Sequence, residues 1–91
     1  MVIKQKAMAG TMESSDCLVY VEPAADLQVE VSSVVMVQFG AAIKKATLDT
    51  LAELGIKQGF IKIQDRGALD CVVKARVETA VRRSEKEVQN A

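Results

Sequence analysis

A strand, a helix and a second strand are predicted in succession between residues 27 and 64, and this order constrains the fold most strongly. Apolar and polar residues alternate over 27–31 and again over 60–64, which is the pattern of half-buried strands. A right-handed helical crossover between two strands of one sheet makes those strands parallel. The inward-facing residues are then Leu27, Val29, Val31, Ile61 and Ile63. We therefore expect a sheet that contains a parallel pair.

The first helix is predicted to begin after Ser32 or Ser33 and to end near Leu54. Either serine can cap the helix by accepting a hydrogen bond from an early backbone N–H. Gly55 suits the left-handed residue that ends a helix. One side of the helix is apolar and is expected to face the core; its members are Phe39, Ile43, Ala46, Leu51 and Leu54.

Two further elements complete the pattern. Residues 17–22 are rich in apolar and β-branched residues and predict a strand, which Pro23 and the residues up to 26 interrupt. This strand is expected to form an antiparallel hairpin with residues 27–31. After a turn at 65–67, a second helix is predicted from about 68 to 85. Its apolar stripe consists of Leu69, Val72, Val73, Val77, Ala80 and Val81.

These elements predict an α+β fold: a small mixed β-sheet with two helices packed on one face, in the order β-β-α-β-α. The 91 residues allow one domain, 1–91, with a single modest core. Residues 1–15 lack a sustained period, apart from short extended stretches expected at 2–3 or 7–8, and are expected to be flexible. Residues 86–91 are expected to fray.

Composition excludes several classes of function. Twelve basic and twelve acidic residues give no net charge, which disfavours an electrostatic nucleic-acid binder. No apolar run approaches the length of a membrane span, and no secretory signal is present. The chain has no histidine, so histidine-based catalysis is excluded. Cys17 and Cys71 are interpreted as buried thiols in a reducing cytoplasm, without a disulfide or a metal site.

The segment from Ala9 to Asp16 is small, polar and predicted to be exposed, and it offers two adjacent hydroxyls, those of Ser14 and Ser15. A serine without a base is a poor nucleophile, so neither hydroxyl is expected to catalyse a reaction itself. Taken alone, the segment predicts a turn or cap, or a site that another protein modifies.

Charged residues near the predicted turns have two interpretations each. Asp65 and Asp70 flank the start of the second helix, where capping is favoured over acid–base catalysis with Glu13. Lys62, Arg66 and Lys74 fit either a phosphate-binding surface or a solvated face. A basic cluster fits the helix C-terminus or contact with a partner subunit; its members are Arg76, Arg82 and Arg83.

Three blocks of this chain resemble the acyl carrier subunit (gamma chain) of citrate lyase. The first is Gly10-Thr11-Met12-Glu13-Ser14, where the family usually has leucine in place of Met12. The other two are residues 38–43, Gln-Phe-Gly-Ala-Ala-Ile, and residues 67–71, Gly-Ala-Leu-Asp-Cys, which continues through Arg76. The resemblance covers nearly the whole chain up to about Ser84.

The resemblance implies a phosphodiester-linked arm, 2′-(5″-triphosphoribosyl)-3′-dephospho-CoA, on the serine that follows Glu13. That serine is Ser14, with Ser15 as the fallback. It also implies a non-catalytic carrier of acetyl and citryl thioesters in citrate fermentation. The implied partners are the alpha (transferase) and beta (lyase) subunits and a prosthetic-group transferase in the cytoplasm. The alternatives are the acyl carrier subunit of malonate decarboxylase, which uses the same arm, and an unmodified structural or adaptor domain.

Overall fold

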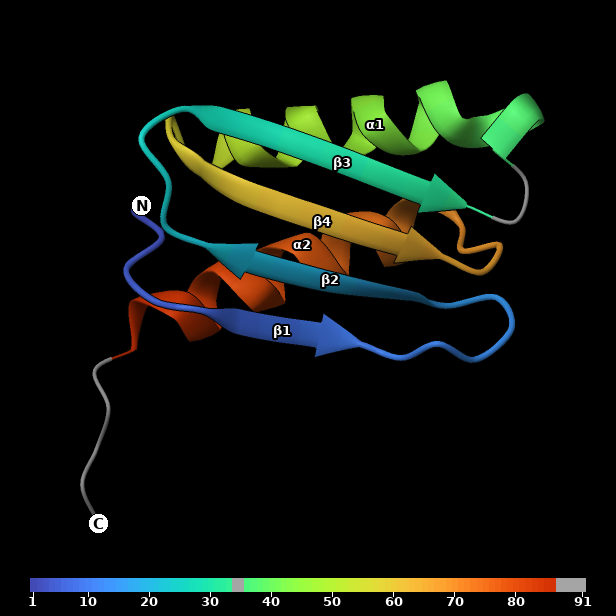
Figure 1. The fold of residues 1–91 in the computed structure, drawn as a ribbon. Coiled ribbons are helices and arrows are strands. Elements are labelled where there is room, and N and C mark those ends of the chain that lie inside the picture. The colour runs from blue at the N-terminus through green and yellow to red at the C-terminus, as the bar shows by residue number, and fades with distance from the viewer. Residues whose placement is uncertain (34–35, 87–91) are drawn as a thin grey trace, which may run out of the picture.

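The computed structural model describes residues 1–33 and 36–86, and it leaves the side chains of 36–39 undescribed. Its elements follow the order β1 (Ala7–Gly10), β2 (Cys17–Glu22), β3 (Leu27–Ser33), α1 (Met36–Glu53), β4 (Gly59–Asp65) and α2 (Asp70–Glu85). The four strands form one mixed sheet, and both helices pack on the same face of it (Figure 1). The predicted α+β fold is confirmed, with β1 added before the expected order.

The sheet order is β1-β2-β4-β3, so β4 lies between the two strands that were expected to form a hairpin. The predicted hairpin is therefore wrong: β2 pairs antiparallel with β4, and β3 pairs parallel with β4. The connection from Glu22 to Leu27 crosses β4, which requires about 10 Å because neighbouring strands lie about 4.8 Å apart. Five Cα steps reach about 17 Å, so the short connection suffices. The predicted parallel pair, β3 and β4, is confirmed.

Part of the segment that was expected to be flexible forms an edge strand. Residues 7–10 pair antiparallel with β2, from Ala7 opposite Val21 to Gly10 opposite Leu18. This strand includes the extended stretch that was predicted at 7–8, whereas residues 2–3 lie outside the strands although Ile3 is buried. Only residues 11–16 then form the loop that holds the two serines. The mobility of that loop stays a prediction.

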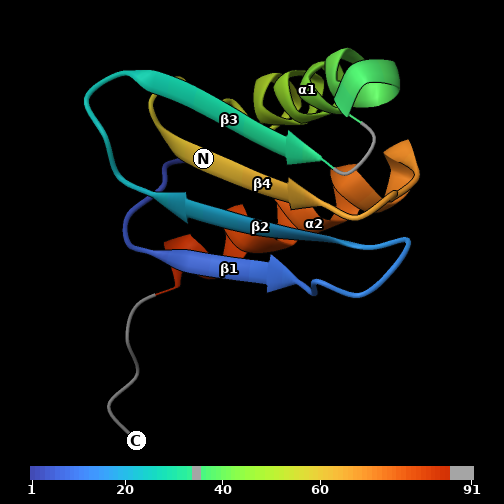
Figure 2. The ribbon, with the colours of Figure 1, turned by 45° about the vertical axis from the view of Figure 1, so that its right-hand side comes forward.

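The core lies between the sheet and the two helices, which Figure 2 shows behind the strands. From α1, the buried side chains include the predicted Ile43, Ala46 and Leu51, whereas Leu54 is half-buried. The predicted Phe39 lies outside the described side chains. From the central strands, the core residues are Cys17, Val19, Val21, Ile61 and Ile63, and from α2 they are Val73, Val77, Ala80 and Val81.

The first helix begins later than predicted because β3 continues through Ser33. Ser32 and Ser33 belong to strand β3. The predicted capping of α1 by one of them involves positions outside the described residues and stays a prediction. The Ser33 hydroxyl also donates to Asp65 Oδ2 at 2.8 Å and joins the ends of β3 and β4. At its other end, α1 closes as predicted: Gly55 has φ +70°, and Ile56 N–H bonds to Leu51 O at 2.9 Å, as in a Schellman motif.

The second helix also begins slightly later than predicted, at Asp70. Leu69 is the residue before the helix and is 71% exposed, so its predicted place in the apolar stripe is wrong. Its backbone carbonyl still accepts the first helical hydrogen bonds, from Val72 N–H and Val73 N–H. The C-terminal residues 87–91, where fraying was predicted, lie outside the described residues.

Candidate modification site

The two serines occupy the middle of a tight turn between β1 and β2. Asp16 N–H donates to Glu13 O at 3.2 Å, which closes a four-residue turn over Ser14 and Ser15. Ser15 has φ +65°, and a positive φ at the third position is the pattern of a type II turn. Both serine side chains are exposed. The turn therefore presents two hydroxyls from one fixed backbone arrangement.

Asp16 anchors this turn to α2. Its carboxylate accepts two hydrogen bonds from Arg76, from Nε at 3.1 Å and from Nη2 at 2.9 Å. The same carboxylate accepts from Thr11 Oγ1 at 2.7 Å and from Cys17 N–H at 2.7 Å. These bonds, with the Arg76 guanidinium first, lower the pKa of Asp16 to about 2. The loop is thus tied to a helix residue sixty positions away.

A second set of bonds ties the loop to the turn after β4. Ser15 N–H donates to Arg66 O at 2.8 Å, and Arg66 N–H donates to Asp16 O at 2.9 Å. On the β1 side, Gly10 has φ +98°, and a Cβ there would lie 1.9 Å from Cys17 O. Only glycine permits this close approach of the two strands. The base of the loop is therefore held on three sides, while its tip projects outward.

The structure separates the two serines by backbone conformation. Ser15 uses its N–H in the bond to Arg66 and adopts the left-handed region, which disfavours residues with a Cβ. Ser14 occupies the preceding corner of the turn and does not have a positive φ. Neither serine hydroxyl makes a hydrogen bond within the described part of the chain. The Ser14 hydroxyl is thus free for an outside reagent.

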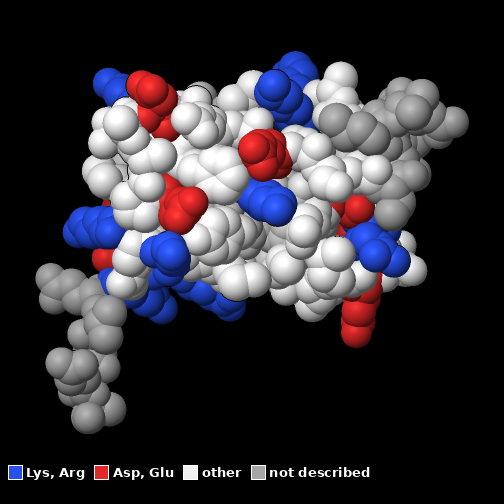
Figure 3. All heavy atoms as spheres, viewed as in Figure 1, with Lys and Arg blue, Asp and Glu red and all other residues white. Residues whose placement is uncertain are grey.

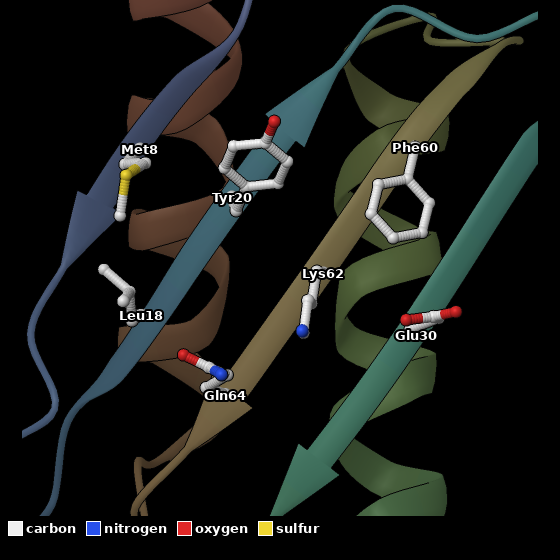
Figure 4. A pocket seen from close by; sticks show the side chains of 7 residues that line it. All are labelled: Met8, Leu18, Tyr20, Glu30, Phe60, Lys62 and Gln64. Atoms are coloured by element: carbon white, nitrogen blue, oxygen red, sulfur yellow. The ribbon is translucent and has the colours of Figure 1, made fainter.

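Of the three cations that were considered for phosphate binding, the structure brings one next to the serines. Arg66 is exposed, and its backbone accepts from Ser15 N–H and donates to Asp16 O. Lys62 lies on the open face of the sheet, opposite Tyr20 in β2 (Figure 4). Lys74 lies toward α1: the pKa of Asp49 is lowered first by its hydrogen bond with Lys45 and, more weakly, by the charge of Lys74.

The basic cluster on α2 makes contacts within the chain. Arg76 pairs with Asp16, and Arg82 Nε pairs with Glu78 at 3.3 Å within the helix. Arg83 Nη1 donates to Met8 O at 2.9 Å, on the edge strand. A partner subunit could still contact Arg82 and Arg83, which are exposed, whereas the two bonds of Arg76 already serve the serine loop.

The predicted acidic caps have different positions. Asp65 is 2% exposed and accepts from Gly67 N–H at 3.1 Å and Ala68 N–H at 2.9 Å, so it stabilises the turn before α2 rather than the helix itself. Asp70 lies in the first turn of α2, where a negative charge complements the helix dipole. The described side chains contain no cluster of three or more metal-binding acids or thiols.

The two cysteines differ in a way that the sequence did not indicate. Cys17 is completely buried, and burial raises the pKa of its thiol to about 11. Cys71 is exposed on α2, which corrects the expectation that both are buried. Both thiols are free, as predicted. Within the described ranges, neither helix has the length and apolar character needed to cross a bilayer.

Two hollows lie on opposite sides of the sheet. One, of about 480 Å³, lies between α1 and the start of α2 and reaches the turn after β4. The other, of about 390 Å³, lies on the open face of the sheet (Figure 4), and its lining includes the apolar Met8, Leu18 and Phe60 and the charged pair Glu30 and Lys62, which are opposite each other on β3 and β4. That face carries charges of both signs (Figure 3). The domain thus combines an accessible hydroxyl at a fixed turn with surfaces that could receive an attached group.

A fixed, exposed serine of this kind suits a carrier domain, and the comparisons with known proteins agree. The family described as "ACP: Malonate decarboxylase delta subunit (MdcD)" matches residues 4–84. The citrate lyase acyl carrier protein of Klebsiella pneumoniae is 47% identical, covering 98% of this chain and 94% of that protein. Those of Treponema denticola and Pectobacterium atrosepticum are 48% and 52% identical, covering 92% of this chain and 97% and 88% of theirs.

Solved structures show the same fold. A chain of the Pseudomonas malonate decarboxylase hetero-tetramer in complex with malonate superposes with a TM-score of 0.72 at 24% identity, covering 90% of this chain and 86% of that one. A Thermus thermophilus protein, ttk003000868, gives a TM-score of 0.59 at 11% identity, covering 91% of this chain and 16% of that one.

The class is therefore that of acyl carrier proteins, which are subunits without catalytic activity of their own. The chain belongs to the family of citrate lyase and malonate decarboxylase acyl carriers, as its resemblance to the citrate lyase gamma chain predicted. Membership of this family implies a covalently attached prosthetic group and a role as one subunit of a larger enzyme.

Proposed function

We propose that this chain is the acyl carrier subunit of citrate lyase and that its attachment residue is Ser14. The observation that carries the proposal is an exposed Ser14 at a fixed turn, in a chain about half identical to several citrate lyase acyl carriers. A carrier needs a rigid body, an accessible hydroxyl and a surface for its partners, and this domain has the first two by construction. Catalysis is left to other subunits.

The residues around Ser14 fit the proposed group, 2′-(5″-triphosphoribosyl)-3′-dephospho-CoA. An exposed hydroxyl can form the phosphodiester, and the exposed Arg66 next to the turn supplies a positive charge for phosphate oxygens. When bound, the group supplies a terminal thiol that carries the acyl unit as a thioester. The chain itself fixes the attachment point: Asp16 and Arg76 hold the turn, and the Ser15 N–H bond orients its tip.

The proposed partners are the alpha (transferase) and beta (lyase) subunits, with a prosthetic-group transferase that loads the arm in the cytoplasm. The arm would carry acetyl and citryl groups between the two active sites while citrate is cleaved to oxaloacetate and acetate. Tethering keeps the thioester at an effective concentration on the order of millimolar near both sites. The purified chain alone should not cleave citrate, and measurable turnover by it would contradict the proposal.

A second candidate function is the acyl carrier subunit of malonate decarboxylase. The family description and the superposed Pseudomonas hetero-tetramer favour it. The identity of 47–52% with citrate lyase carriers, against 24% with the decarboxylase chain, supports the first candidate more strongly. An unmodified adaptor domain would gain no mass on incubation with the prosthetic-group transferase and its donor, so intact mass also tests that alternative.

Two serine variants test the attachment residue. Ser14→Ala should fold normally and gain no arm after incubation with the transferase and its donor, because the remaining hydroxyl lies on a different corner of the turn. Ser15→Ala should still be loaded, because the hydroxyl of Ser14 and the backbone bond from residue 15 to Arg66 are both retained. Intact mass and peptide mapping give the result. Loading of Ser14→Ala, or loss only in Ser15→Ala, would move the site to the fallback residue Ser15.

A further inference from the structure

The cavity between α1 and the start of α2 has an apolar wall and an acidic rim. Its volume is about 480 Å³, within the range of small-molecule sites. Ala42 and Ile43 of α1 line one side, and Ala68 and Leu69 line the other. Leu69 is 71% exposed although it is large and apolar, so it adds little to the core. A ligand with an apolar body would cover this surface.

The cavity adjoins the serine turn. The backbone of Arg66 bonds to Ser15 N–H and to Asp16 O, and the next residue, Gly67, belongs to the cavity wall. The blocks at 38–43 and 67–71 that resemble the carrier family supply residues to this same wall, yet the attachment chemistry uses neither block. An arm that starts at Ser14 therefore begins beside the cavity and does not have to cross the sheet to enter it.

The charged groups at the cavity are both acidic. Asp65 is buried, and its carboxylate accepts hydrogen bonds from Ser33 Oγ and from the N–H groups of Gly67 and Ala68. Asp70 is exposed at the rim. No lysine or arginine is among the lining residues, all of which lie in the described ranges. Like charges repel, so these two carboxylates disfavour a bound carboxylate relative to a neutral group.

We propose that this cavity shelters the neutral end of the arm, as a free thiol or as an uncharged acyl thioester, and rejects acyl groups that carry a carboxylate. The inference rests on the proposed attachment at Ser14. A neutral acyl group is protected between reactions, whereas a carboxylate-bearing group stays outside, where partner subunits can reach it. The hollow on the open face is the competing resting place, since it contains a cation, Lys62, as well as the opposing Glu30.

The first experiment uses the loaded full-length chain and methyl NMR. Loading on Ser14 is verified by intact mass, and spectra are compared for the unloaded chain and for chains that carry a butyryl or a succinyl thioester. These two acyl groups have similar length and differ in one carboxylate. We expect butyryl to shift the methyl signals of Ala42, Ala68 and Leu69, and succinyl to leave them as in the unloaded chain. The Asp70→Asn variant should partly restore the shifts with succinyl.

The second experiment measures how fast a thiol reagent reacts with the arm. A Cys71→Ser background removes the exposed cysteine, and Cys17 is buried with a raised pKa, so the arm provides the reactive thiol. Ala42→Phe places a bulky side chain at an exposed position of the cavity wall, and Ala41→Phe is the matched control on the neighbouring exposed position outside it. If the thiol is sheltered nine-tenths of the time, Ala42→Phe speeds its reaction about tenfold. Ala41→Phe should not change it.

Separate outcomes test the two proposals. If no arm attaches to the wild-type chain, the function and the shelter both fail. If the arm attaches to Ser14 but the methyl shifts appear at Leu18 and Met8 of the open face, or nowhere beyond the serine turn, the shelter alone is wrong. Equal shifts at Leu69 with butyryl and succinyl would refute the discrimination by charge. Should Ala42→Phe fail to fold, the NMR comparison on the wild-type chain decides.

Discussion

Replacing Ser15 with glycine should stabilise the domain, although glycine usually weakens a fold. Ser15 has φ +65°, and a residue with a Cβ costs about 1–2 kcal/mol in this region. Glycine removes that strain but loses more conformational freedom on folding, a cost of roughly 0.5–1 kcal/mol. The Ser15 hydroxyl has no hydrogen bond within the described residues, so no side-chain contact is lost. The net gain should be up to about 1 kcal/mol.

Thermal unfolding followed by circular dichroism measures this effect. A gain of about 1 kcal/mol raises the midpoint by about 4–8 °C in a domain of roughly 60–100 residues. Ser15→Val is the matched opposite change: a β-branched residue is a strong outlier at positive φ, so it should lower the midpoint by a similar amount. Both variants should still be loaded at Ser14.

A lower midpoint for Ser15→Gly, or equal midpoints for the glycine and valine variants, would show that the turn is not left-handed at Ser15 in solution. If Ser15→Gly were still loaded in that case, loading at Ser14 would not depend on a left-handed turn. If loading were lost in Ser15→Gly while stability rose, the hydroxyl of Ser15 rather than its backbone would be the functional group.

Three further changes test the rest of the argument. The pKa of Asp16 lies near 2 rather than the usual 3.8, so its contribution to stability is present above about pH 4 and lost as pH falls toward 2; midpoints of wild type and Asp16→Asn should converge over that interval, and a constant difference would rule out the pairing with Arg76. Gly10→Ala should cost about 2–3 kcal/mol more than Gly67→Ala in urea unfolding, because both have positive φ but only Gly10 faces the carbonyl oxygen of Cys17. Val73→Asp should unfold the domain because an unpaired buried carboxylate costs several kcal/mol out of about 5–15, whereas Lys74→Asp, at an exposed position, should keep a cooperative transition.

The parallel unit of the fold could be predicted because its signals are local. Alternation in residues 27–31 and 60–64 and the helical period between them depend on side chains a few positions apart. The strand partner of residues 17–22 could not be predicted from such signals. Pro23 marks a break in the chain, but the choice between a hairpin and a crossing connection depends on whether β4 fills the space between. Residues 7–10 are Ala-Met-Ala-Gly and include no β-branched or aromatic residue, so the full edge strand follows from pairing with β2 rather than from its own sequence.

The candidate site likewise combines a local sequence signal with contacts between distant residues that the sequence did not indicate. Ser14 was predicted as the attachment residue from the resemblance of its local motif to the carrier family, and its side chain is exposed. The anchoring of its turn depends on Asp16 and Arg76, which are sixty residues apart, and no spacing rule links them. Arg76 was assigned to a basic cluster at the helix C-terminus because only neighbouring charges were visible. The one sequence signal for this anchoring was an acid, Asp16, directly after the two serines. It did not indicate that Arg76 is its partner.

The hydrogen bonds that anchor the turn also bear on how far a tethered acyl group can reach. Fifteen free residues would add a root-mean-square reach of about 20 Å to any attached arm, and effective concentration falls roughly as the −3/2 power of tether length. A loop whose ends lie in β1 and β2 and whose Asp16 binds Arg76 adds far less reach. The freedom of movement then belongs to the arm, whose length is set by its chemistry. If the arm is attached to Ser14 as proposed, such a domain holds the acyl group within a defined radius of Ser14, and the partner active sites are expected inside that radius.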